Sequence, residues 1–150
     1  MQNVKTTYLN LLVISASIVC FEIVSTRVSS VIFVSNYAFI ILSVAILGLG
    51  LGGIYSHYKI KPDAGDESYK AVVKYTFLIG ISLVLFIGAV ILLVITNPFV
   101  YFLLLSLPFF FGGIVFSQLY KLFAGYSFTL YAYDLAGAAA GAVGTIFILN

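Results

Sequence analysis

Charged side chains are scarce in this sequence. Asp, Glu, Lys and Arg make up only 8% of its 150 residues, whereas 63% are hydrophobic. Soluble domains carry about 25% charged residues, so this chain has too few of them to cover a surface that faces water. The composition suits a molecule whose outside faces lipid, with its backbone polar groups satisfied inside helices. The formal net charge of +2 is also too small to indicate a nucleic-acid partner.

Cysteine and histidine are nearly absent, with one of each, Cys20 and His57. A single cysteine cannot form an internal disulfide, and no group of His and Cys has the spacing of a metal site. The sequence also has no Ser-His-Asp set and no pair of carboxylates arranged for hydrolysis. We therefore expect neither catalytic residues nor a metal site, and no motif specifies a cofactor.

Long apolar stretches, by contrast, fill the chain. Five of them reach the roughly 20 residues that a membrane helix requires, at 8–33, 37–57, 75–96, 99–121 and 129–150. We predict an all-α fold, an integral membrane bundle of about five transmembrane helices that forms a single domain over residues 1–150. A polar loop is expected at 59–74 and tight turns at 35–36 and 97–98, where Ser-Asn and Asn-Pro occur.

The lysines predict how the bundle is oriented. If the N-terminus is inside, all six fall on the cytoplasmic side: Lys5, Lys59, Lys61, Lys70, Lys74 and Lys121. Positive residues concentrate on the cytoplasmic side of membrane proteins. We therefore expect a multi-pass protein of the cell membrane with its N-terminus inside and its C-terminus outside.

Small residues mark two predicted helices as packing elements. Gly48 and Gly52 are four residues apart in the second span, and Gly137 and Gly141 have the same spacing in the fifth. Glycines at this spacing share a helix face and let a partner helix approach closely, which matters in lipid because apolar burial there gains little. The glycines of the second span lie inside an apolar stretch, so they are not interpreted as a nucleotide-binding loop.

Three ionisable residues lie inside the predicted spans: Glu22, Arg27 and Asp134. A charge at the bilayer centre costs about 2.5–3.5 kcal/mol on insertion scales, so such residues are candidates for function. One interpretation is structural: Glu22 and Arg27 pair directly or through a neighbour, and Asp134 accepts hydrogen bonds from another helix. The other is that Glu22 or Asp134 handles protons or cations in a cavity.

Several segments resemble the membrane part of the membrane-bound spermidine synthase-like proteins. The similar segments are residues 22–27 (Glu-Ile-Val-Ser-Thr-Arg), 35–38, the glycine-rich 47–53, 108–113 (Pro-Phe-Phe-Phe-Gly-Gly) and 130–141 with its Tyr-Asp-Leu-Ala-Gly run. They occur in that family's order. The family's aminopropyltransferase domain has no counterpart in these 150 residues, so the resemblance implies a membrane module that acts beside a catalytic or redox partner, not aminopropyl transfer.

Two functions remain open from the sequence. The first is a non-catalytic membrane subunit or scaffold, which associates with other membrane subunits or with itself through small-residue faces and polar contacts. The second is a small oligomeric transporter coupled to protons or cations through Glu22 or Asp134. Residues 22–26 are similar to the helix of the small multidrug transporters that carries a membrane-embedded Glu.

Overall fold

The computed structural model describes residues 4–33, 38–60, 66–93 and 97–149, and these are almost entirely helical. The helices are α1 (Val4–Ile32), α2 (Ala38–Lys59), α3 (Asp66–Leu93), α4 (Pro98–Leu122), the short 3-10 helix η2 (Ala124–Tyr126) and α5 (Ser127–Leu149). Five of the described helices are long and apolar enough to cross a membrane. The predicted all-α fold class with about five transmembrane helices is therefore confirmed.

The structure differs from the sequence prediction in the expected loop at 59–74. Helix α3 already begins at Asp66, so the second half of that segment is helical. A hydropathy pattern shows where a helix enters lipid, not where it starts. The predicted turn at 35–36 lies outside the described residues.

The turn before α4 has a capping residue. The side chain of Asn97 accepts a hydrogen bond from the backbone N–H of Phe99 at 3.0 Å, and Pro98 occupies the first turn of the helix. Asn is a favoured N-cap, and proline is tolerated at the start because its missing N–H would have no partner there. These two residues start α4 where the predicted turn at 97–98 places it.

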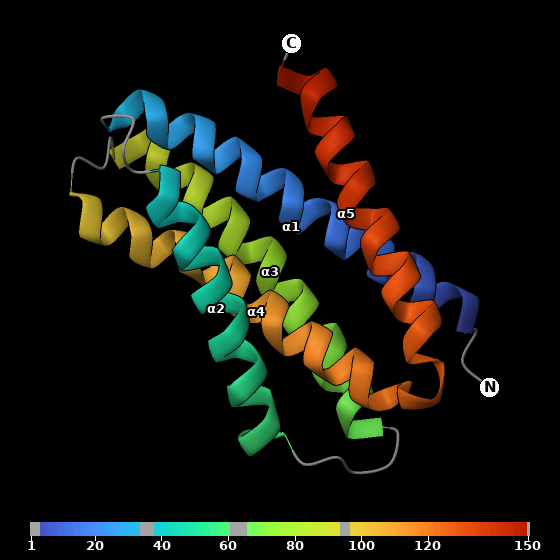
Figure 1. The fold of residues 1–150 in the computed structure, drawn as a ribbon. Coiled ribbons are helices and arrows are strands. Elements are labelled where there is room, and N and C mark those ends of the chain that lie inside the picture. Colours follow the sequence, from blue (N-terminus) through green and yellow to red (C-terminus); the bar gives the residue numbers. More distant parts are fainter. Residues whose placement is uncertain (1–3, 34–37, 61–65, 94–96, 150) are drawn as a thin grey trace.

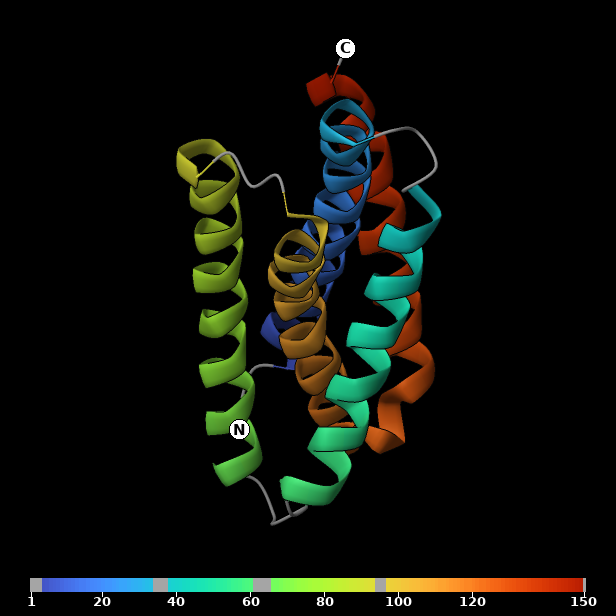
Figure 2. The same ribbon diagram turned by 90° about the vertical axis from the view of Figure 1, so that its left-hand side faces the viewer.

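Helix α4 is the centre of the bundle. Figure 2 shows it between α3 and α2, with α1 and α5 behind. It supplies several fully buried side chains of the core, among them Tyr101, Leu105, Phe109 and Ile114. Around Tyr101 the aromatic rings pack at close range, with the Phe86 ring centroid from α3 at 5.2 Å. The central helix therefore holds α2, α3 and part of α1 together.

Helices α2 and α4 approach each other at glycines. A Cβ atom added to Gly52 would overlap the backbone oxygen of Phe110, and one added to Gly113 would overlap the backbone of Leu49. A Cβ on Gly48 would lie 2.8 Å from the Cβ of Phe109. The two helix backbones are thus in direct contact, which only glycine at these positions allows.

Helices α1 and α5 make a second contact of this kind. A Cβ atom on Gly137 would overlap the backbone of Leu12, and one on Gly141 the backbone of Ala16. The two helices cross in this region and then diverge, so that the C-terminal half of α1 leaves α5 (Figure 1). Thr145, one turn beyond Gly141 on the same face of α5, is still fully buried, so the packing on α1 continues to about this level.

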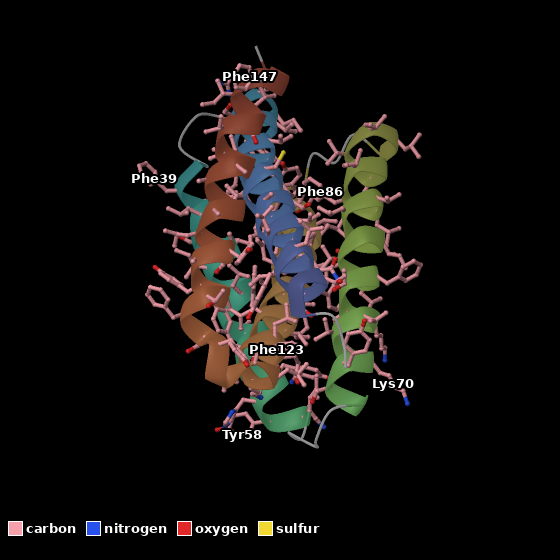
Figure 3. The ribbon with its side chains drawn as sticks, turned by 90° about the vertical axis from the view of Figure 1, so that its right-hand side faces the viewer. Phe39, Tyr58, Lys70, Phe86, Phe123 and Phe147 are labelled. Atoms are coloured by element: carbon pink, nitrogen blue, oxygen red, sulfur yellow. The ribbon has the colours of Figure 1, made fainter. Side chains whose placement is uncertain are left out.

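The two ends of the bundle differ in character. Figure 3 shows Tyr58, Lys70 and Phe123 at one end and Phe39 and Phe147 at the other. The last residue of α2, Lys59, and the last turn of α4, with Lys121, belong to the same end as Lys70. The clustering of lysines matches the pattern on which the expected orientation rests; the orientation itself stays a prediction.

Candidate functional site

Asp134 of α5 is tied to two other helices. The Ser15 hydroxyl of α1 donates a hydrogen bond to its Oδ1. The Tyr120 hydroxyl of α4 lies 3.5 Å from its Oδ2, at the limit of hydrogen bonding. Beside this cluster, the rings of Tyr8 and Tyr133 stack with centroids 5.1 Å apart. Asp134 therefore has partners inside the chain, as a polar clasp between α1, α4 and α5 requires.

Glu22 of α1 is in the opposite situation. Its side chain is half-buried, and its backbone oxygen accepts a hydrogen bond from the Thr26 hydroxyl. Within the part of the chain that the structure describes, its carboxylate has neither a hydrogen-bond nor an ion-pair partner. An intramembrane carboxylate normally pairs with another group or faces a water-filled cavity. Glu22 thus has an unmet requirement for a donor or a cation.

Arg27 does not meet that requirement. Five residues at 3.6 per turn separate the two side chains by about 140° around α1. The Arg27 side chain is exposed, and no ion pair joins it to Glu22 among the described residues. The structure therefore does not contain the direct Glu22–Arg27 pair that one sequence interpretation allowed.

Glu22 belongs to a row of polar side chains along one face of α1. Tyr8, Ser15, Glu22 and Ser29 are spaced by seven residues, which places them on nearly the same helix face. Tyr8 stacks on α5 and Ser15 bonds to α5, while the Ser29 hydroxyl bonds to the Tyr101 hydroxyl of α4 at 2.6 Å, with both residues buried. Three members of the row therefore have a hydrogen bond or a ring contact with another helix, and among the described residues Glu22 has neither.

A second polar cluster joins the lysine-rich ends of α2 and α4. Gln118 Nε2 donates to the Ser56 hydroxyl at 2.7 Å, and Lys121 Nζ donates to the Ser56 backbone oxygen at 3.2 Å. Gln118 is fully buried, and its Oε1 has no partner among the described residues. The sequence analysis did not identify Ser15, Ser29 or Ser56 as interhelical partners. The spacing of seven residues from Glu22 could have indicated Ser15 and Ser29, but it does not apply to Ser56, which lies on α2.

The polar side chains described above form small sets, each shared between two or three helices. No group of three or more His, Cys, Asp or Glu side chains that could hold a metal occurs in the described residues. The four glycines singled out from the sequence all lie against helices of the same chain. No protein-family model matches this sequence, and comparisons with curated proteins and with solved structures likewise find no match.

Proposed function

We propose that this chain is a non-catalytic subunit or scaffold of a larger membrane complex in the cell membrane. The observation that carries the proposal is the unpartnered Glu22 carboxylate. A charged group near the bilayer centre costs about 2.5–3.5 kcal/mol on insertion scales. A donor or a cation from a neighbouring subunit would offset this cost. The chain itself supplies no such group among the residues that the structure describes.

The position of Glu22 supports this role. It lies on the polar row of α1, one seven-residue step beyond Ser15 and past the crossing with α5. Its side chain is only half-buried within this chain, so part of its surface is left for a group from another subunit. The glycine faces are already used inside the chain, so the contact with a partner would be polar.

Substitutions of Glu22 and Asp134 test the proposal as a matched pair. Each lies in a helix that is long and apolar enough to span a membrane, but among the described residues only Asp134 has hydrogen-bond partners. We expect Glu22→Leu to release the partner subunit during purification in mild detergent, while the chain keeps its melting temperature. Asp134→Asn should do the reverse: the chain melts earlier but still retrieves the same partner below that temperature. Quantitative mass spectrometry of the co-purified proteins measures how much partner subunit is recovered per copy of the chain.

The Glu22→Gln variant shows which kind of group in the partner subunit binds the Glu22 carboxylate. Gln keeps a hydrogen-bonding group without the charge, so retained binding points to a neutral donor and lost binding to a Lys or Arg. The proposal is wrong if the wild-type chain purifies alone from its native membrane, or if Glu22→Leu retrieves every subunit at the wild-type ratio.

The same carboxylate supports a second candidate, a small oligomeric transporter coupled to protons or cations. Glu22 is the stronger candidate for this coupling because Asp134 is held by Ser15 and Tyr120. Such a transporter should show pH-dependent uptake in liposomes that disappears in Glu22→Gln while the fold survives. Unchanged pH-dependent uptake in that variant removes Glu22 from the mechanism.

The relation to membrane-bound spermidine synthase-like proteins is also a proposal. It rests on segments 22–27, 47–53, 108–113 and 130–141, which occur in that family's order. Under this proposal the partner includes a separate catalytic or redox protein. Recovery of a synthase-like protein with the wild-type chain, but not with Glu22→Leu, would connect the two proposals. Recovery of membrane subunits alone would leave only the scaffold role.

A further inference from the structure

An open groove separates α3 from the first half of α1. Helix α3 packs chiefly on α4, so its side toward α1 is largely uncovered. The groove has a volume of about 1020 Å³, and Leu119 and Phe123 from the end of α4 close its back. Figure 3 looks onto this side of the molecule, with α1 and α3 next to each other and Phe123 near the lower end. Ligand pockets reach about 1,000 Å³.

The groove is polar at one end and apolar along the rest. Thr6, Thr7 and Asn10 of α1 line the end that is rich in lysines, with Tyr69 and Thr76 of α3 opposite. In the described part of the chain, the hydroxyl and amide groups of these five side chains make no hydrogen bond. Further along α3 the lining is formed by apolar side chains and by Gly80. The lining therefore matches an amphipathic molecule with its polar part at the lysine end.

Positive charge adjoins the polar end. Lys70 and Lys74 are not lining residues themselves, but each lies eleven residues before a lining residue, Ile81 or Leu85, and about 20° from it around the helix. The Lys74 Nζ atom lies 5.8 Å from the centroid of the Tyr75 ring. Figure 3 shows Lys70 at this end of α3, on the edge of the helix that is turned away from α1. Asp66 and Glu67 precede them at the start of α3, but Lys59 and Lys121 end their helices on the same side. Lysines at a membrane surface attract anionic lipids.

The length of the apolar part favours a lipid over a transmembrane helix. The apolar lining of α3 runs from Val72 to Leu85, a rise of about 19.5 Å at 1.5 Å per residue. One leaflet contributes about 15 Å of the roughly 30 Å hydrocarbon core. The apolar lining is thus closer in length to one leaflet than to the whole hydrocarbon core, which a spanning helix would have to cross.

We propose that the groove binds one anionic phospholipid of the lysine-side leaflet. Its phosphate accepts hydrogen bonds from Thr6, Thr7, Asn10 and Thr76, and an acyl chain lies along Gly80 toward Leu85. The site is separate from Glu22, which does not line the groove. It therefore does not depend on the scaffold role.

Gly80 allows the groove to be filled selectively. A Cβ atom at Gly80 meets nothing within 4 Å, and the same holds at Gly144 on α5, which is not in the groove. Gly80→Leu therefore starts its side chain in open space at the groove wall, and Gly144→Leu is the matched control. Both replacements also improve helix propensity, by about 1 kcal/mol relative to Gly.

The test is native mass spectrometry of the full chain, delipidated in mild detergent and offered equal phosphatidylglycerol and phosphatidylcholine. We expect one phosphatidylglycerol per chain, bound in preference to phosphatidylcholine. Gly80→Leu should lower its occupancy at least tenfold, and Gly144→Leu should leave it unchanged. Lys70→Gln with Lys74→Gln should reduce the preference by about fivefold per lysine, which corresponds to ~1 kcal/mol of attraction each.

Three results would overturn the proposal. One is equal binding of the two lipids by the wild-type chain. Another is unchanged phosphatidylglycerol occupancy in Gly80→Leu. The third is that Gly80→Leu releases a protein subunit but no lipid, which would assign the groove to a helix. If Gly80→Leu fails to fold, its melting curve would show this beside that of Gly144→Leu. The double variant Lys70→Gln, Lys74→Gln then tests the proposal: an unchanged preference for phosphatidylglycerol would overturn it.

Discussion

Two glycines of α2, only two residues apart, should respond oppositely to the same substitution. A methyl group at Gly52 would overlap the backbone oxygen of Phe110 and lie 3.0 Å from the backbone nitrogen of Ile114. Backbone atoms cannot rotate aside, so α2 and α4 must separate and lose contacts along their whole interface. Such overpacking costs about 1–3 kcal/mol. At Gly50 the methyl group meets nothing within 4 Å, and alanine gains up to about 1 kcal/mol of helix propensity.

Gly52→Ala should therefore be about 2 kcal/mol or more less stable than Gly50→Ala. For a chain of this size the difference corresponds to roughly 4–8 °C in melting temperature. The assay is thermal unfolding of both variants in the same detergent, followed by the loss of the monodisperse peak in size-exclusion chromatography. Equal melting temperatures, or a more stable Gly52→Ala, would refute the close contact between α2 and α4.

The remaining predictions concern hydrogen bonds and the second glycine contact. Tyr101→Phe removes the buried bond to Ser29 and should cost about 0.6 kcal/mol, at most about 1.7, in the same melting assay; no change would show that the bond contributes nothing. Ser56→Ala leaves the buried Gln118 amide without its partner and should cost about 1–3 kcal/mol, whereas adding Gln118→Leu should recover most of that loss; additive losses would contradict this coupling. Gly141→Ala forces α5 away from the backbone of α1, so it should destabilise the chain by about 1–3 kcal/mol, and unaltered stability would place the two helices further apart.

The helices themselves could be predicted from the sequence because lipid imposes a strong constraint. A span of about 20 apolar residues must be helical, since its backbone groups have no other partners in the bilayer. The start of α3 at Asp66 was missed because its first two turns are polar. A helix outside the hydrocarbon needs no apolar pattern, so hydropathy does not detect it.

Which helices pair could not be predicted in the same way. Apolar side chains are nearly equivalent against lipid or against another helix, so the pattern of Leu, Ile and Val does not identify a partner. The serines are ambiguous as well. Ser17 and Ser43 donate to backbone oxygens of their own helices, whereas Ser15 and Ser29 reach other helices. Only the three-dimensional arrangement separates these two kinds of serine.

For the candidate site, the sequence singled out Glu22 and Asp134 but not their difference. Both are carboxylates inside spans, and both met the criterion for functional candidates. The structure places Asp134 beside Ser15 and Tyr120 and leaves Glu22 without a partner in the described residues. That contrast depends on where α5 crosses α1, which no local pattern encodes.

The proposed assembly at Glu22 is tested most directly by photo-cross-linking in native membranes. A photoreactive residue at position 26, one turn from Glu22 on the same side of α1, should form an adduct with another polypeptide that mass spectrometry identifies. We expect Glu22→Leu to abolish this adduct without lowering the melting temperature of the chain. Adducts with lipid alone, or a protein adduct that persists unchanged in Glu22→Leu, would contradict it.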